Sequence, residues 1–187
     1  MNNKKRSGEH NRKISAGRIS LCGILCAAAL VIFVAEAQLP PLLPVPGAKL
    51  GLANIITLFA LLYLTPGETA LILVSRILLG AAFCGQPSAI LYSLCGGVLC
   101  LVGEMFLLRL FGRRFICEIS VVGAMLHNIG QLCCAALITK TATVFSYLPV
   151  LLIAGAVCGA FCGLCILILD RVYGKKFMAM LKKDAER

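Results

Sequence analysis

The stretch VFSYLPVLLIAGAVCGAFCGLCILIL, residues 144–169, has no charged side chain and is long enough to cross the hydrocarbon core of a bilayer. The whole chain of 187 residues is similar in character, with 60% hydrophobic and 14% charged residues and a mean hydropathy of +0.95. A soluble domain would be about half apolar and about a quarter charged. Lipid must therefore surround most of the chain, which excludes a secreted domain, a cytosolic enzyme and a disordered protein.

Six apolar segments predict an all-α integral membrane fold, a six-transmembrane-helix bundle. At about 20 residues per span, the chain has no room for a second soluble domain. The predicted spans are residues 19–39, 50–64, 68–83, 88–111, 116–139 and 144–169. A tight turn is expected at Thr65-Pro66-Gly67. The membrane domain would cover residues 19–170, between basic cytoplasmic tails at 1–18 and 171–187.

Basic residues gather at the ends of the chain and give a net charge of +10. If the N-terminus is cytoplasmic, fifteen of the eighteen Lys and Arg lie inside, Lys49 and Lys140 lie outside, and Arg76 lies within a span. By the positive-inside rule this predicts a multi-pass protein of the cytoplasmic membrane with both termini in the cytoplasm. The tails would touch anionic lipid headgroups. No nucleic-acid partner is expected, because no basic stripe lies on a soluble face.

The first span also allows a second interpretation. Its basic start, apolar residues 21–34 and the sequence Ala35-Glu36-Ala37 resemble a cleavable signal peptide. Cleavage would leave the orientation of the other spans unchanged.

Eleven cysteines occur, nearly all within apolar runs, where cysteine behaves as a small hydrophobic residue. Disulfide frameworks belong to small secreted domains, so reduced thiols are expected. Cys158, Cys162 and Cys165 share a helical face, but nothing nearby resembles a set of metal ligands. Neither a metal nor a cofactor is predicted.

Polar residues inside the apolar segments are the functional candidates, since lipid burial is costly unless they are paired or face a cavity. The direction of each span brings several to one level, between the midplane and the outer surface. The predicted ligand-binding residues are Lys49, Asn54, Arg76, His127, Asn128 and Gln131. The last three are spaced to line one helix face. They predict an outward-facing pocket for a small molecule, with polar contacts between helices as the alternative.

Arg76 needs an anionic partner inside the bundle, because arginine stays charged at any ordinary pH. Three sources are open: Glu36, Glu104, or a carboxylate or phosphate on a ligand. The two glutamates are therefore candidate ion-pair residues, and Glu104 could also pair with Arg109.

Small residues at four-residue spacing indicate helix-packing faces, because helices in lipid associate through close backbone approach. Gly155, Gly159 and Gly163 form such a ridge on the sixth span, and Gly23 and Ala27 form one on the first. Packing within the bundle is the preferred interpretation, and docking to a partner subunit is the alternative.

Catalytic patterns are missing from the sequence. It has no GxxxxGK[ST] loop for nucleotides and no GxSxG or HExxH motif. Prenyl diphosphate synthesis needs clustered aspartates to hold Mg²⁺, whereas this chain has only Asp170 and Asp184. The chain is therefore not expected to be an enzyme.

Four motifs follow one another along the chain: PGAKLGLANI at 46–55, RILLG at 76–80, SLCGG at 93–97 and GAMLHNIGQ at 123–131. Together they resemble the Gx transporter family, also labelled heptaprenyl diphosphate synthase component I. That family is similar to the substrate-binding S components of energy-coupling-factor transporters, which are six-helix membrane proteins with an outward-facing site. The synthase label implies an association with prenyl diphosphate or menaquinone metabolism.

Two functions are expected. The first is a membrane substrate-binding or transport subunit that captures a small molecule from the outer face. Because it lacks an ATPase, a transmembrane coupling subunit with paired ATPases or an ion gradient would energise it. The alternative is a non-catalytic membrane component associated with heptaprenyl diphosphate or menaquinone biosynthesis.

Overall fold

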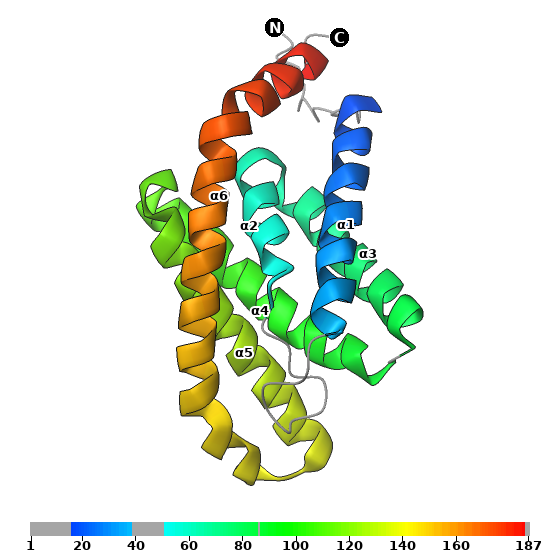
Figure 1. Cartoon of the computed structure of the whole chain (residues 1–187), viewed down its shortest axis with the longest axis vertical. Coiled ribbons are helices and arrows are strands. Elements are labelled where there is room, and N and C mark those ends of the chain that lie inside the picture. Colours follow the sequence, from blue (N-terminus) through cyan, green and yellow to red (C-terminus); the bar gives the residue numbers. More distant parts are fainter. Residues whose placement is uncertain (1–15, 39–50, 86, 186–187) are drawn as a thin grey trace, which may run out of the picture.

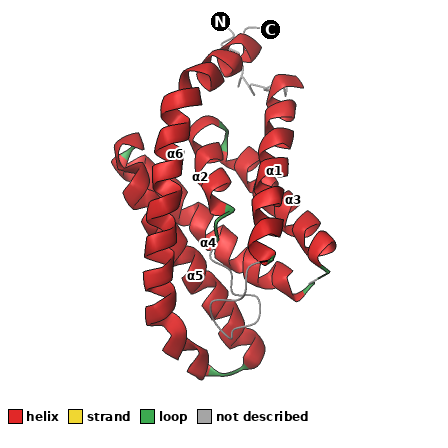
Figure 2. Ribbon diagram, in the orientation of Figure 1, coloured by secondary structure: helices red, strands yellow, loops and turns green. Residues whose placement is uncertain are grey.

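The computed structural model describes residues 16–38, 51–85 and 87–185, and all regular structure in these ranges is helical (Figures 1 and 2). The α-helices are α1 (Ala16–Ala37), α2 (Asn54–Tyr63), α3 (Pro66–Cys84), α4 (Ser88–Phe111), α5 (Ile116–Thr139) and α6 (Leu148–Ala185). Two short 3₁₀ helices connect α4 to α5 (η1, Arg113–Phe115) and α5 to α6 (η2, Ala142–Tyr147). The predicted all-α class is therefore confirmed.

Five of the described helices are long and apolar enough to cross a membrane: α1, α3, α4, α5 and α6. The second predicted span is instead represented by α2, which has 10 residues. At 1.5 Å per residue α2 is about 15 Å long, roughly half the thickness of the hydrocarbon core. A bundle of membrane helices is thus supported, while six complete crossings stay a prediction.

The predicted turn at Thr65-Pro66-Gly67 begins α3. The Glu68 amide donates to the Thr65 hydroxyl at 3.3 Å, and the Thr65 amide donates to the Glu68 carboxylate at 2.8 Å. This capping box satisfies two amides that the first helical turn leaves without partners. Arg18 of α1 adds a salt bridge of 2.9 Å to the same carboxylate, so the starts of α1 and α3 are tied together.

The last helix is longer than expected. α6 has 38 residues and continues through much of the region predicted as a separate tail, residues 171–187. Phe177 and Leu181 pack partly buried against the core, which explains why the helix goes on. Gly174 does not break it, and a Cβ there would lie 2.6 Å from the Tyr63 hydroxyl.

α2 is the central element and contacts all five other α-helices (Figure 1). Eight of its ten residues are buried. Around it, α5 packs against both α4 and α6, and α1 packs chiefly against α3. The start of α1 and the end of α6 lie at the same end of the bundle (Figure 1). Which side of a membrane this end faces stays a prediction.

The end of α2 is held by side chains from two other elements. Arg113 of η1 donates to the carbonyl oxygen of Leu62, and the Tyr63 hydroxyl donates to the carboxylate of Asp170 on α6. The Arg113 guanidinium also lies over the Tyr63 ring, 5.1 Å from its centroid. A positive charge near the C-terminal end of a helix interacts favourably with the helix dipole. The C-terminal end of α2 is therefore held by Arg113 and Asp170, which belong to η1 and α6.

The glycine ridge of α6 packs inside the bundle against α5. A Cβ on Gly159 would lie 2.6 Å from the Val121 Cα, and one on Gly163 would lie 2.8 Å from the Cys117 Cα. At Gly155 the near atom is the Asn128 amide nitrogen, at 2.7 Å. The two helix backbones thus approach more closely than any side chain at these positions would allow.

The small residues of α1 do not form an internal packing face in the described bundle, so for them only the alternative, docking to a partner subunit, stays a prediction. A Cβ on Gly23 would meet no atom within 4 Å, and Ala27 is exposed. α1 instead buries the apolar row of Leu21, Leu25 and Ala29. The first span is apolar on all sides, so its composition could not show which side turns inward.

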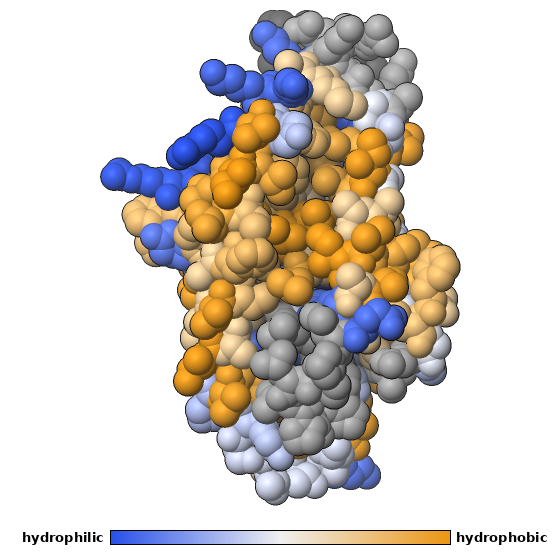
Figure 3. Space-filling view, in the orientation of Figure 1, coloured by the Kyte–Doolittle hydropathy of each residue, from blue (hydrophilic) through white to orange (hydrophobic). Residues whose placement is uncertain are grey.

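The outside of the described bundle is covered by large apolar side chains (Figure 3). Leu137 is 78% exposed, Phe83 73% and Val157 69%. Soluble monomers rarely expose such continuous apolar surface, so this surface suits lipid contact. The most hydrophilic side chains project mainly from the upper end of the view in Figure 3.

Candidate functional site

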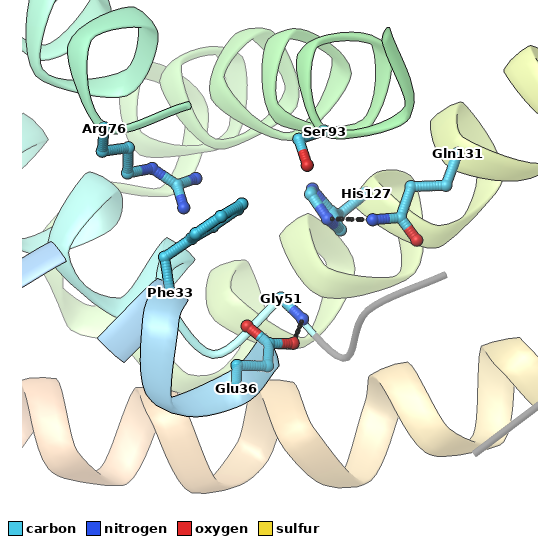
Figure 4. Close-up of a pocket in the computed structure, with 7 residues that line it drawn as sticks. All are labelled: Phe33, Glu36, Gly51, Arg76, Ser93, His127 and Gln131. Carbon is cyan, nitrogen blue, oxygen red and sulfur yellow. Dashed lines mark hydrogen bonds between the residues drawn. The ribbon is translucent and has the colours of Figure 1, made fainter. Parts of the chain in front are cut away.

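A cavity lies at the start of α2, where parts of four other helices meet (Figure 4). It holds about 230 Å³, including the part open to its surroundings. The lining residues are Phe33, Glu36, Gly51, Arg76, Ser93, His127 and Gln131. Most of them are polar, although the bundle around them is apolar, which makes the cavity the candidate site.

Arg76 lies in the middle of α3 and is only 3% exposed. Its Nη2 donates to Oδ1 of Asn54 at 2.8 Å, and its Nε has no hydrogen-bond partner among the described residues. No carboxylate oxygen of those residues comes within 4.0 Å of the guanidinium. The expected salt bridge from Arg76 to Glu36 or Glu104 is therefore not formed. At hydrogen-bond distance, the only described partner of this cation is a neutral amide.

Glu36 holds the chain that leads into α2. Its Oε1 accepts the amide hydrogen of Gly51, with a distance of 2.6 Å between oxygen and nitrogen (Figure 4). Gly51 has a φ of +80°, a conformation that favours glycine. A Cβ at this position would also lie 3.0 Å from His127 Cδ2 and from Asn54 Nδ2. Glycine thus lets the backbone pass closely between the glutamate and the histidine.

His127 and Gln131 share one face of α5, as their spacing predicts. The Nε2 atoms of the two side chains lie 2.8 Å apart, while His127 Nδ1 has no hydrogen-bond partner among the described residues (Figure 4). α4 comes close to this pair because Gly96 has no side chain. A Cβ there would lie 2.8 Å from the His127 carbonyl oxygen and 2.9 Å from Gln131 Cγ.

The Phe33 ring projects into the space between Arg76 and His127 (Figure 4). It is 3% exposed. On its other side the ring lies against Gly80 of α3, where a Cβ would collide with ring carbons Cδ1 and Cε1. An aromatic ring thus forms one wall of a cavity whose other lining groups are mostly polar.

Three of the six predicted ligand-binding residues line the cavity: Arg76, His127 and Gln131. Asn54 reaches it only through its hydrogen bond to Arg76. Asn128 does not line it, since its Nδ2 donates to the carbonyl oxygen of Leu151 on α6 at 2.7 Å. The expectation that all three α5 residues face one pocket is thus corrected, because each residue turns about 100° from the one before. Lys49 lies outside the described residues.

Glu104 lies elsewhere in the bundle and is 1% exposed. Its carboxylate packs against Gly123 of α5, where a Cβ would be 2.5 Å from Oε1, and Oε2 has no hydrogen-bond partner among the described residues. No arginine or lysine nitrogen in the described ranges comes within 4.0 Å of it. The predicted ion pair with Arg76 or Arg109 is therefore absent from this structure.

The cysteines of the chain are all free thiols. Cys158 and Cys162 are buried on α6. In the part of the chain that the structure describes, no three His, Cys, Asp or Glu side chains group as metal ligands would.

Sequence reasoning missed three lining residues: Phe33, Gly51 and Ser93. Gly51 and Ser93 lie inside the motifs quoted above for the family resemblance, which is the signal that could have identified them. Phe33 gives no signal, because an aromatic residue in an apolar span looks the same whether it faces lipid or a cavity.

A family model described as heptaprenyl diphosphate synthase component I matches residues 25–169. All seven lining residues of the cavity fall within this range. The match confirms the resemblance of the sequence motifs. No curated protein and no solved structure matches the chain.

Proposed function

The chain belongs to the heptaprenyl diphosphate synthase component I family, and from this starting point we propose that it is a membrane subunit that binds a small molecule in the cavity at the start of α2. The observation that carries the proposal is Arg76, a buried cation that lines a cavity inside an apolar bundle. A charged group at such a position is costly in lipid and is retained where a ligand or an ion pathway uses it.

The binding role is supported by the mixture of groups around the cavity. Arg76, Ser93 and Gln131 offer hydrogen-bond donors, Glu36 offers acceptors, and Phe33 offers an apolar wall. Small-molecule sites are built in this way, with a few placed polar groups in an apolar enclosure. The molecule would enter from the outer face, on the side away from the basic helix ends.

Movement of the molecule across the membrane would need partners. The sequence has no nucleotide-binding loop, so energy would come from a transmembrane coupling subunit with paired ATPases or from an ion gradient.

The family name favours a second candidate, a non-catalytic membrane component of a heptaprenyl diphosphate synthase. Catalysis by this chain itself is not part of that proposal, since Asp170 and Asp184 are its only aspartates and cannot form an Mg²⁺-binding cluster. Affinity purification from native membranes in mild detergent separates the two candidates. Recovery of a coupling subunit with ATPases supports transport, and recovery of a soluble polyprenyl synthase supports the second candidate.

The binding role is tested by native mass spectrometry of the gently purified protein. A bound metabolite is expected on the wild type and on Arg109→Lys, whose side chain is exposed on α4. Arg76→Lys keeps the charge but loses the planar fork, so occupancy should fall at least about tenfold. An equally occupied Arg76→Lys would place the ligand elsewhere. Absence of any bound molecule from wild-type protein would contradict a binding role.

A further inference from the structure

The charge of Arg76 requires compensation, and the described residues do not supply it at close range. The sequence allowed three anionic partners, of which two are glutamates of the chain. Both are buried, yet neither brings a carboxylate oxygen within 4.0 Å of the guanidinium. Both glutamates act on Arg76 electrostatically from farther away, so a direct contact between the guanidinium and an anion would have to come from the third source, a ligand.

Each glutamate has a local reason for its position. Glu36 accepts the Gly51 amide at 2.6 Å, so its carboxylate serves the start of α2. Glu104 lies on the side of α4 that meets α5, against Gly123. Moving Glu36 to Arg76 would break its hydrogen bond to the Gly51 amide at the start of α2.

Arg76 is also oriented to receive an anion. Asn54 accepts a hydrogen bond from Nη2, while Nε is buried and has no hydrogen-bond partner among the described residues. The cavity adds a further donor, the Ser93 hydroxyl. Guanidinium groups bind carboxylates and phosphates through two parallel hydrogen bonds.

The size of the cavity limits what can enter. The volume of about 230 Å³ includes space that is open to the surroundings, so the enclosed part of the cavity is much smaller. It suits one small group, with the rest of the ligand extending through the open side.

We propose that the ligand of this cavity carries a carboxylate or phosphate group that binds the Arg76 guanidinium. This inference rests on the proposed binding function and narrows it to anionic molecules. A carboxylate and a phosphate offer the same oxygen acceptors to the fork, so the experiment includes one probe of each class.

The test is thermal unfolding in detergent, followed with a thiol-reactive dye that reports exposure of buried cysteines such as Cys100 and Cys162. Inorganic phosphate and succinate are the probes, each compared with chloride at equal ionic strength. For the wild type, one of them should raise the midpoint by about 2–4 °C when it is in roughly fivefold excess over its Kd. The probe that acts at the lower concentration identifies the class.

The Arg76 variants decide whether that shift comes from the cavity. Arg76→Gln should lose it, Arg76→Lys should keep a smaller one, and the exposed control Arg109→Gln should respond like the wild type. Each variant is compared with its own midpoint in chloride, so a general change in stability does not affect the result. If Arg76→Gln does not fold, Arg76→Lys alone gives the answer.

Equal shifts in wild type and Arg76 variants, or no shift with either anion in the wild type, would overturn the inference. An uncharged metabolite that native mass spectrometry finds bound, and that Arg76→Lys loses, would also overturn it while leaving the binding function intact. Failure of the proposed binding function would look different, because native mass spectrometry would then find no molecule bound to the wild type.

Discussion

Gly80 sets the position of the Phe33 ring and with it one wall of the cavity. A Cβ at residue 80 would collide with the ring, so Gly80→Ala must displace either Phe33 or α3. Both changes alter the cavity, while alanine improves the helix propensity of α3 by about 1 kcal/mol. We expect ligand binding to fall about tenfold with little loss of thermal stability.

The control for this variant is Gly67→Ala, in the first turn of the same helix, where a Cβ meets no atom within 4 Å. It should bind like the wild type. Unchanged binding by Gly80→Ala in the native mass spectrometry assay would show that the ring can move without affecting the site.

Asn128 joins two helices rather than facing the cavity. Asn128→Ala removes its hydrogen bond to the Leu151 carbonyl oxygen, and the unfolding midpoint in detergent should fall by the equivalent of about 0.5–2 kcal/mol. Binding should change less than in Arg76→Lys, because Asn128 does not line the cavity. A binding defect as large as that of Arg76→Lys, with normal stability, would return Asn128 to the ligand site.

The interface between α5 and α6 depends on backbone contact along the glycine ridge. Gly159→Leu would drive a branched side chain into Val121 and the Ser120 carbonyl oxygen. We expect destabilisation beyond the roughly 1–3 kcal/mol of an overpacked core, because the obstacle is main chain and cannot rotate away.

Gly23→Leu is the matched control, since a Cβ on Gly23 of α1 meets no atom within 4 Å. Its unfolding midpoint should stay near that of the wild type. Comparable losses in both variants would mean that added bulk, rather than the α5–α6 contact, is responsible.

The short helix α2 links the two regions of polar contacts in the bundle. At its start the Gly51 amide and Asn54 join Glu36 and Arg76, and at its end Tyr63 bonds to Asp170 of α6. A ten-residue helix held in this way has little freedom to slide without breaking contacts at one end. The contacts at the start of α2 are the ones that border the cavity.

The orientation of the whole molecule is tested by cysteine labelling in a background without the native cysteines. Arg114 lies in the connection before α5, and Lys140 lies directly after α5. The two residues are therefore at opposite ends of that helix. With both termini cytoplasmic, Lys140→Cys should react with an impermeant reagent on intact cells, and Arg114→Cys should react only after permeabilisation. The reverse pattern would invert the topology. Arg114 is preferred to Arg113, because Arg113 helps to hold α2.

Fold class and most helix limits could be predicted from residue order, because they depend on local properties. A run of apolar residues must form its hydrogen bonds within the segment when lipid surrounds it, which makes it a helix. The spans predicted at 88–111 and 116–139 coincide with α4 and α5. The turn before α3 was predicted from Thr65, Pro66 and Gly67, because such turn residues act locally and need no distant partner.

The surroundings of each polar side chain required the folded bundle. In lipid both the inner and the outer face of a helix are apolar, so periodicity does not show which way a residue points. Packing alone set Asn128 toward α6, turned Gly23 outward and kept both glutamates beyond salt-bridge distance of Arg76. The rotation of each helix about its axis depends on backbone contacts with its neighbours, such as Gly96 against His127 and Gly159 against Val121. Those contacts join residues far apart in the chain, which is why the charge of Arg76 could be recognised from the sequence but its missing partner could not.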